Sequence, residues 1–463
     1  MSRKSRVGSV SFGISSAEET WKCAPLRPLP MQNPKLMLDM AHPPRYFINV
    51  RNKLHPHLSS VDVRPHNRRL LLQILRSSGP NSRAHLASSS GPSPAAVTNV
   101  VTDLLQSGLV EDLGTEPAPQ EGAGPGRPGS LLALSRSPQA VLSVQIGSGF
   151  LNIGVCNLQA TLLASKSTRF ELPTPPEAVL DLAVGMMKEV LSDAGLSIDD
   201  VLGVGVGAPG AVDRTQRINL TSNKLNWHHV HIADHLEKAL GVGVIVDHNV
   251  RAMAMGEVRY GAGRDLESLA FIYIRTGVGA GLVLGGREYR GGTHGSVELG
   301  HLRVITAGLA CECGGSGCLE TVTTDSAIRA QLLATVLGTD PVSVERILGD
   351  DWTEWFVESV LAGNPRTMRI RDDLVSNLAS ALLNVINLLN PQRIVLGGLL
   401  GDLAAIVLQP LRDVTLQQVM PLLRDAVTIE ESTFGADAGL IGAATVTLDR
   451  YVFGAPLLQS QAS

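Results

Sequence analysis

Features that would assign a chain to the membrane, to secretion or to general nucleic-acid coating are missing from this sequence. No run of about 18 apolar residues occurs, so we predict no membrane span. The N-terminus is basic but no apolar core follows it, which argues against a secretory signal. A formal net charge of −4 argues against wholesale coating of nucleic acid, although it allows a local basic patch. We therefore expect a cytoplasmic protein.

The leading segment lacks any hydrophobic period. The chain of 463 residues is long enough for two or three domains, and its hydrophobic content of 44% allows large cores. Residues 1–63, by contrast, contain seven prolines and scattered basic residues. Such a segment cannot bury enough apolar area to offset the entropy lost on ordering, so we expect a disordered or loosely ordered arm.

Residues 64–136 carry the pattern of a winged helix-turn-helix. An apolar helix ends at Gly79-Pro80, a short helix begins after Ser82, and a third begins after Ser93. Two short apolar strands follow the third helix, and a Gly/Pro-rich loop separates them. This order predicts a DNA-binding domain of three helices and a wing.

Particular side chains of this domain are candidates for DNA contact. On the third helix we predict that Ser93, Thr98 and Asn99 face the major groove, and that Arg127 in the loop reaches a minor groove. Between positions 45 and 90, eight Lys and Arg residues, Arg76 among them, stand against one acid, which favours a phosphate-facing surface. The alternative for the loop is a plain linker between two domains.

Three of the five cysteines fall in one stretch, Glu298 to Glu320. Cysteine-rich clusters in cytosolic proteins are more often metal or catalytic sites than disulfides. Three thiolates and one imidazole are the ligand set of a closed zinc site, so we predict Zn²⁺ bound by a set of four ligands: His301, Cys311, Cys313 and Cys318. The alternative is a group of buried free thiols or a redox pair.

Residues 137–455 alternate strands and helices in two similar modules. Each module opens with a strand, a glycine turn and a second strand, first near Ala140 and again near Leu269. Modules of this kind predict a two-lobed α/β body with a ligand cleft between the lobes.

At this point the chain resembles the ROK family, which groups sugar-responsive repressors with sugar kinases of the actin-like ATPase fold. The resemblance covers about residues 66–450 and is most specific at the pattern G-H-x9-C-x-C-G-x-x-G-C-L-E, met by residues 300–320. The segment N-P-Q-R-I-V-L-G-G, residues 390–398, is similar to the strand and glycine turn on the family's nucleotide side. The resemblance implies a set of sugar-binding residues: Gly210, His248, Asn249, Glu298, His301 and Glu320, with Asn223 as a less certain neighbour.

The chain departs from the family's kinases where catalysis occurs. Kinases carry Asn-Asp, with the Asp as general base, where this chain has His248-Asn249. A carboxamide is too weak a base to accept the sugar proton, although Asp247 two positions earlier is a conceivable replacement. The kinase phosphate loop D-x-G-G-T is also lost, because Gln145 stands in place of the acid that would steer Mg²⁺.

These residues together predict a transcriptional regulator, expected to be a repressor, and no enzyme activity. Its partners would be operator DNA and a sugar or sugar-phosphate effector, and it would act as a homodimer or homotetramer. The alternatives are an ATP-dependent sugar kinase with an added DNA-binding domain and a constitutive regulator that has lost sugar binding.

Overall fold

The structure is a computed structural model that describes residues 60–115, 130–136, 139–264, 266–292, 295, 297–336 and 340–454. The predicted arm up to residue 59 lies outside the described residues, and so does most of the predicted wing loop with Arg127. Among the described residues no helix is both long and apolar enough to cross a membrane.

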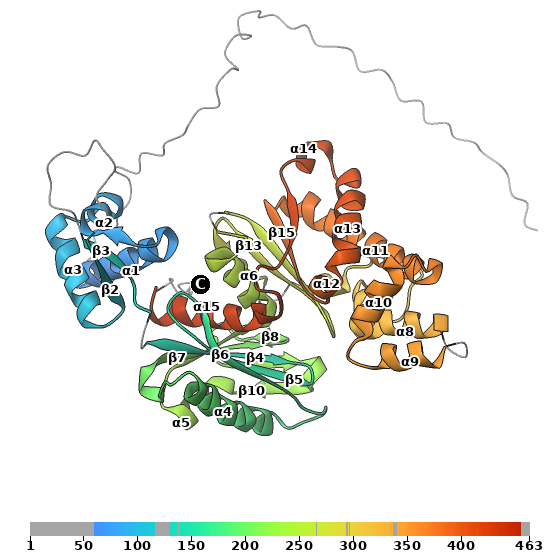
Figure 1. Cartoon of the computed structure of the whole chain (residues 1–463), viewed down its shortest axis with the longest axis horizontal. Helices are drawn as coiled ribbons and strands as arrows, with labels where there is room; N and C mark the ends of the chain where they lie inside the picture. The colour runs from blue at the N-terminus through green and yellow to red at the C-terminus, as the bar shows by residue number, and fades with distance from the viewer. Residues whose placement is uncertain are drawn as a thin grey trace, which may run out of the picture. The chain divides into compact units, whose positions relative to one another are not determined.

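The first described segment consists of three helices and a small sheet, and we call it the N-terminal module (Figure 1, blue to cyan). Its elements are α1 (Ser60–Ser78), β1 (Asn81–Ser82), α2 (Arg83–Ser90), α3 (Pro94–Gln106), β2 (Val110–Thr115) and β3 (Ser130–Leu134). The hydroxyl oxygens of Ser82 and Ser93 accept hydrogen bonds from the first turns of α2 and α3, so both helices begin where the sequence predicts. Strand β3 lies between β1 and β2 in an antiparallel sheet. Helix α1 starts at Ser60, a few residues before position 64, where the sequence predicts this domain to begin.

The first lobe of the body is built on a five-stranded sheet in the order β11-β7-β4-β5-β6. Its elements are β4 (Ala140–Gly147), β5 (Phe150–Cys156), β6 (Leu162–Arg169), α4 (Pro176–Asp193), η1 (Ile198–Asp200), β7 (Val201–Ala208), β8 (Ala211–Val212), β9 (Asn219–Ser222), η2 (Asn223–Leu225), β10 (Trp227–Val230), α5 (Ile232–Leu240) and β11 (Val244–His248). Strands β4, β7 and β11 run parallel, with Val144, Val206 and Val246 side by side in register. These strands are continuous apolar runs because helices cover both faces of the sheet.

The second lobe repeats this scheme in a sheet of order β14-β13-β12-β15-β16. Its elements are α6 (Asn249–Tyr260), β12 (Leu269–Ile274), β13 (Val278–Leu284), β14 (Arg287–Glu288), η3 (Leu299–His301), α7 (Glu320–Thr323), α8 (Asp325–Val336), α9 (Pro341–Leu348), α10 (Trp352–Leu361), α11 (Pro365–Leu389), β15 (Arg393–Gly398), α12 (Leu399–Asp402), α13 (Ala404–Gln418), α14 (Pro421–Arg424), β16 (Thr428–Glu431), η4 (Gly435–Asp437) and α15 (Ala438–Tyr451). The two predicted strand–glycine turn–strand hairpins are present as β4–β5 and β12–β13.

Two helices, α6 and α15, lie between the sheets (Figure 1). Helix α15 packs on β4 and β7 of the first lobe, and α6 packs on β12 and β13 of the second. They cross closely, because a Cβ atom added at Gly442 of α15 would lie 2.6 Å from the backbone of Ala252 in α6. A side chain at position 442 would therefore push the helices apart.

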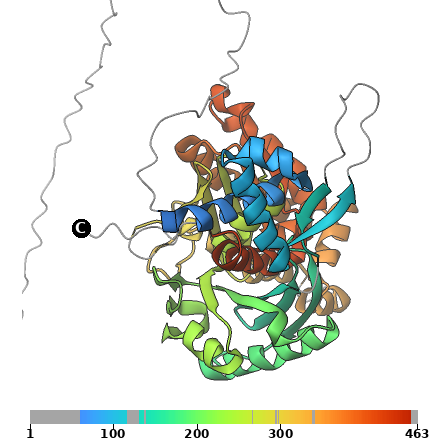
Figure 2. The ribbon, with the colours of Figure 1, turned by 90° about the vertical axis from the view of Figure 1, so that its left-hand side faces the viewer.

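The N-terminal module shares one apolar core with the body. Leu71 and Leu72 of α1 and Leu104 of α3 are fully buried in the same cluster as Leu448 of α15 and Phe453, which follows that helix. Figure 2 shows the helices of the module (blue) beside α15 (red). The module is thus packed against α15, one of the two helices between the sheets.

Candidate functional site

The His301 and cysteine side chains predicted to bind zinc come together in one cluster. Their ligand atoms all lie within 4.8 Å of one another. Cys313 Sγ lies 3.7 Å from Cys318 Sγ, and Cys311 Sγ lies 3.5 Å from His301 Nδ1. Tetrahedral zinc bonds of about 2.3 Å to sulfur and about 2.0 Å to nitrogen would place these pairs about 3.8 Å and about 3.5 Å apart. The donor set and its spacing therefore fit a tetrahedral metal site.

Glycines allow the cluster to form on so short a segment. A Cβ at Gly317 would lie 1.8 Å from the carbonyl oxygen of Ile305, so only glycine fits there. Isolated bridges between Arg303 and Cys318 and between Ala310 and Ser316 close the loop on itself. Helix α7 begins two residues after Cys318, so the cluster fixes the direction of Glu320.

Three of the predicted sugar ligands lie in this cluster or next to it in sequence. Glu298 is exposed immediately before η3, and His301 ends that turn. Glu320 lies close to them, because its Oε2 is 3.1 Å from where a Cβ of Gly300 would stand. His301 presents Nδ1 to Cys311, which leaves Nε2 for another partner such as a sugar hydroxyl.

The other predicted sugar ligands come from the first lobe and its junction with α6. His248 ends β11 and Asn249 begins α6, and both are half-buried. Val250 packs against Gly279 of β13, the strand whose first backbone N–H points to Glu320 at 3.4 Å. The β11–α6 junction and the metal-site loop thus meet around the start of β13. Gly210 has φ +85° in the turn after β7, where a Cβ would lie 2.1 Å from the carbonyl oxygen of Thr221.

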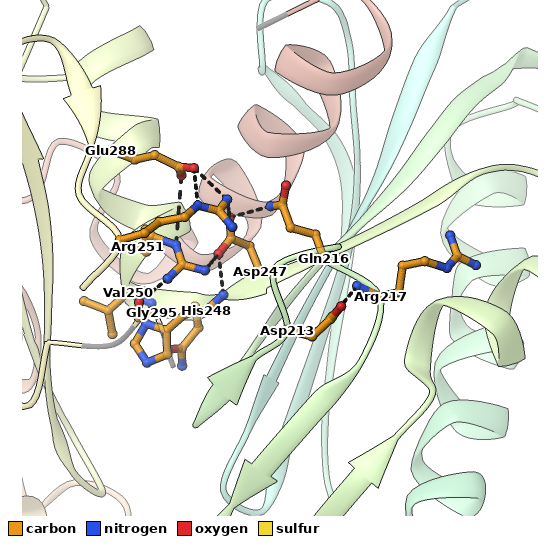
Figure 3. Close-up of polar contacts among 11 residues, drawn as sticks. Asp213, Gln216, Arg217, Asp247, His248, Val250, Arg251, Glu288 and Gly295 are labelled. Atoms are coloured by element: carbon orange, nitrogen blue, oxygen red, sulfur yellow. Dashed lines mark hydrogen bonds and ion pairs between the residues drawn. The ribbon is translucent and has the colours of Figure 1, made fainter. Parts of the chain in front are cut away.

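Asp247 is the centre of a buried charge network (Figure 3). Its carboxylate accepts hydrogen bonds from Gln216 Nε2 at 2.9 Å, from the backbone N–H of His248 at 2.6 Å and from Arg251. Arg290 Nη2 lies 3.3 Å away. Four donors occupy its lone pairs and only 1% of the residue is exposed, so Asp247 is not placed to serve as general base. Burial and four donors argue against the replacement role that the sequence leaves open for Asp247.

The same network ties the two lobes together. Asp247 belongs to the first-lobe sheet, whereas Glu288 and Arg290 lie at the edge of the second-lobe sheet and are paired at 2.6 Å. Arg251 also donates to the carbonyl oxygen of Gly295, which stands in the segment leading to Glu298. Burial and the nearby Asp247 charge raise the pKa of Glu288.

The position that holds the general base in kinases of the family carries no carboxylate in this chain. The side-chain oxygen of Asn249 accepts a hydrogen bond from the backbone N–H of Val250 at 2.8 Å. Burial, together with the neighbouring Arg251 charge, lowers the pKa of His248 to about 4, so this imidazole is neutral at physiological pH. Neither side chain offers a carboxylate that could take a proton from a sugar hydroxyl.

Side chains of the chain itself pack against the first glycine turn. Gln145 Oε1 accepts from Asn152 at 3.0 Å, and a Cβ at Gly439 of α15 would lie 2.1 Å from the Gln145 side chain. The Phe150 ring covers Gly147, where a Cβ would lie 2.0 Å from the ring. A neutral amide packed in this way supplies no anionic ligand for Mg²⁺.

A cavity of about 900 Å³ opens between the lobes at this turn. It is lined by both glycine turns, including Ser148 and Thr276, and by the Gly397-Gly398 turn. Its charged lining residues are three arginines and four acids: Arg169, Arg275, Arg329, Asp325, Asp350, Asp402 and Glu431. Each arginine is paired with an acid, at 2.9 Å for Arg169–Asp350 and 2.8 Å for Arg275–Asp402. This lining carries no surplus of positive charge for a polyphosphate, and none of the predicted sugar ligands is part of it.

Comparison with known proteins decides the family. The ROK family pattern matches residues 141–450. The chain belongs to the ROK family. The xylose repressor of Bacillus subtilis (strain 168) is 23% identical over 390 residues, which are 84% of this chain and 97% of that repressor. The DNA-binding transcriptional repressor Mlc of Escherichia coli (strain K12) is 25% identical over 395 residues, 83% of this chain and 93% of Mlc.

Kinases of the ROK family match a smaller part of the chain. The glucokinase of Thermotoga maritima is 31% identical over 251 residues, which are 53% of this chain and 79% of that enzyme. Among solved structures, a ROK family transcriptional regulator described as a homolog of E. coli Mlc has a TM-score of 0.70 at 27% identity and covers 84% of this chain and 97% of its own. A ROK family glucokinase from Streptomyces griseus, solved with glucose and AMPPNP, has a TM-score of 0.58 at 27% identity and covers 66% of this chain and 98% of its own. The body therefore has the sugar-kinase fold of the ROK family.

In this ROK chain α3 presents the side chains predicted to read DNA. Thr98 and Asn99 are exposed, and Ser93 is exposed at the start of the helix. The Ser93 hydroxyl caps the helix, and the Thr98 hydroxyl donates to the carbonyl oxygen of Pro94 at 2.8 Å. Arg127 lies outside the described residues, so its predicted contact stays a prediction.

Arg76 of α1 has a role that the sequence does not indicate. Only 9% of its side chain is exposed, it is paired with Asp449 of α15, and it lies 4.2 Å above the Phe453 ring. Asp449 is also paired with Arg259 at the end of α6, at 3.1 Å. Arg76 is therefore not on a phosphate-facing surface, and that part of the basic-patch prediction is wrong. We call the Arg76, Asp449 and Arg259 contact the joint.

Proposed function

We propose that this protein is a DNA-binding transcriptional regulator, acting as a repressor, whose kinase-like body binds a sugar or amino-sugar effector without phosphorylating it. One observation carries the proposal. The match of this chain to the xylose repressor extends over 84% of its residues and so includes the N-terminal module, whereas the match to the Thermotoga glucokinase covers 53%.

The site geometry supports the absence of catalysis. A sugar kinase needs a general base beside the sugar hydroxyl and an anionic ligand that helps to hold Mg²⁺. Here Asn249 replaces the base, Asp247 is saturated by donors, and Gln145 is an amide packed against Gly439. The paired glutamates and His301 nevertheless retain groups that can accept or donate hydrogen bonds to a polyol.

In this proposal the N-terminal module is a winged helix-turn-helix that binds operator DNA. Helix α3 enters the major groove with Ser93, Thr98 and Asn99, and Arg127 contacts a minor groove from the wing. Two such modules from a homodimer, or from a homotetramer, would bind a pseudo-palindromic site.

Helix α6 offers the physical route between the two sites. It begins at the effector residues His248 and Asn249, and its last turn carries Arg259, which is paired with Asp449 of the joint. A helix of 12 residues is about 18 Å long and moves as a rigid element. Sugar binding at its first turn would therefore shift the joint, and by linkage DNA binding would alter sugar affinity by the same factor.

Zinc is the metal that best fits the Cys₃His cluster. Soft thiolates with one imidazole in a closed tetrahedron are typical of structural zinc. Zinc bound there would fix the loop that carries Glu298 and Glu320, because both residues stand within three positions of a ligand.

Capture of genomic DNA tests the proposal. Sheared DNA from the source organism would be incubated with the purified chain and the bound fragments sequenced, with a Thr98→Ala/Asn99→Ala double variant as control. We expect a few fragments sharing an inverted repeat, and loss of their enrichment with the variant. Uniform recovery of all sequences by the wild type would contradict sequence-specific binding.

The second candidate is an ATP-dependent sugar kinase, which is favoured by the 31% identity to a glucokinase and by the cavity between the glycine turns. It is tested with ATP, Mg²⁺ and D-glucose, N-acetyl-D-glucosamine or N-acetyl-D-mannosamine. Sugar-dependent formation of ADP above background would support this candidate. A constitutive regulator, the third possibility, would give no calorimetric signal with any sugar while still binding DNA.

A further inference from the structure

The predicted effector site contains two carboxylates, Glu298 and Glu320, but the ligands inherited from the family include no lysine or arginine. Glu298 and Glu320 are acceptors only when ionised. A sugar hydroxyl, however, has both a proton to donate and lone pairs that need a donor. The side-chain N–H groups of the inherited ligands come from His248, Asn249 and His301, and none of them is an ammonium or guanidinium donor.

Lys224 supplies such a donor from the opposite lobe. It stands in η2 of the first lobe, and its Nζ lies 2.9 Å from Glu320 Oε1 and 3.2 Å from Glu312 Oε2 in the metal-site loop. Its Cε lies 3.8 Å from where a Cβ of Gly277 would stand, so the side chain also lies beside the second glycine turn.

The Lys224 ammonium group is paired with two carboxylates and has a third N–H donor. Lysine has three N–H donors, and the two carboxylates engage two of them. The Lys224 side chain is 34% exposed, which leaves room for a further partner of the third donor. The backbone also holds the residue, because Ser148 Oγ donates to the carbonyl oxygen of Lys224 at 3.4 Å.

The local charge selects among effectors. Lys224 carries one positive charge, and its partners Glu312 and Glu320 carry two negative charges. Glu298 adds a further negative charge at the same loop. A phosphate or carboxylate on the sugar would meet net negative charge here, whereas a neutral hydroxyl could donate to Glu320 and accept from Lys224.

We propose that Lys224 is an effector-binding residue that closes on the sugar from the first lobe, and that the effector is a neutral sugar rather than a sugar phosphate. This inference rests on the proposed function. It adds a ligand that the family pattern does not supply, and it decides between the two effector classes that the sequence leaves open. The Lys224–Glu320 pair also places one effector contact on each side of the cleft.

Calorimetric titration of the full chain tests the inference. The probes are D-glucose, N-acetyl-D-glucosamine and D-xylose, each of the two hexoses also as its 6-phosphate. The variants are Lys224→Met, Lys224→Arg and the control Lys238→Met, an exposed lysine on α5 of the same lobe. Metal content and the thermal unfolding midpoint of each variant show that the fold and the cluster are intact.

We expect a neutral sugar to bind the wild type at least tenfold more tightly than its phosphate. Lys224→Met should weaken that binding at least tenfold, Lys224→Arg should restore part of it, and Lys238→Met should leave it unchanged. Equal or tighter binding by Lys224→Met, or preference for the phosphorylated sugar, would overturn the inference while leaving the proposed function standing. A wild type that binds none of the probes would overturn sugar sensing, and this inference with it.

Discussion

Replacing Asp449 by asparagine should loosen the N-terminal module from the body, because it removes the only acid of the joint. Arg76 would then be left with 9% of its side chain exposed and no carboxylate beside it. Arg259, the other partner, has 26% of its side chain exposed and can be hydrated in place. The cost of the change therefore comes mainly from Arg76.

The burial of the joint residues sets the expected loss in the free energy of unfolding. Breaking a buried ion pair by removing one partner costs about 3–5 kcal/mol, and the part-exposed Arg259 places Asp449→Asn near about 3 kcal/mol. Arg76→Met leaves Asp449 paired with Arg259 and retains contact with Phe453, so it should cost about 1–2 kcal/mol. Arg64→Gln is the matched control, because this α1 arginine is 68% exposed in its pair with Asp103 and should cost less than about 1 kcal/mol.

Urea unfolding followed by circular dichroism gives the free energies, and limited proteolysis reports release of the module. The double variant Arg76→Met/Asp449→Asn should be more stable than the sum of the single effects by about 1 kcal/mol or more, because the uncompensated charge is gone. Single variants that add without coupling, or an Asp449→Asn protein within about 0.5 kcal/mol of wild type, would refute the reasoning.

The remaining predictions concern the metal, a titrating group and the wing. Cys313→Ser should lose zinc and lower stability and sugar response; an unchanged metal content by elemental analysis would contradict the ligand assignment. His248 faces Asp247 and Arg251, and its pKa is lowered to about 4. As the pH falls below the ordinary pKa of histidine, the unfolded chain therefore binds a proton at this residue and the folded chain does not. Stability should therefore fall between about pH 6.5 and pH 4, by about 1–3 kcal/mol given that the ring is half-buried, and His248→Asn should flatten that part of the curve in thermal melts. Arg127→Ala should weaken operator binding by about 1–3 kcal/mol, and undiminished affinity in a footprinting titration would make its loop a linker.

Much of the fold could be predicted from local sequence signals. The caps at Ser82 and Ser93 and the stop at Gly79 depend on nearest neighbours, so they appear in the chain where the structure has them. The two hairpins around glycine turns are local in the same way. The two lobes were predictable from the repeated modules, whereas the packing of α6 and α15 between the sheets depends on contacts far apart in sequence and has no local signal.

The same difference between local and long-range contacts decides which site residues could be predicted. Four metal ligands within 18 residues are visible as a spacing, and the structure brings them together. Lys224 could not be found in this way, because its partner Glu312 is 88 positions away. Arg76 was misassigned for the same reason, since its partner Asp449 lies 373 positions away and nothing near Arg76 in sequence shows its burial.

The affinity of the full chain for a captured DNA fragment, measured with and without a saturating neutral sugar, tests the central claim most directly. We predict that at least one sugar changes the dissociation constant at least tenfold, which is about 1.4 kcal/mol of coupling, while ATP present in the same sample is not consumed. The same affinity at every sugar concentration, or consumption of ATP in step with sugar, would contradict it.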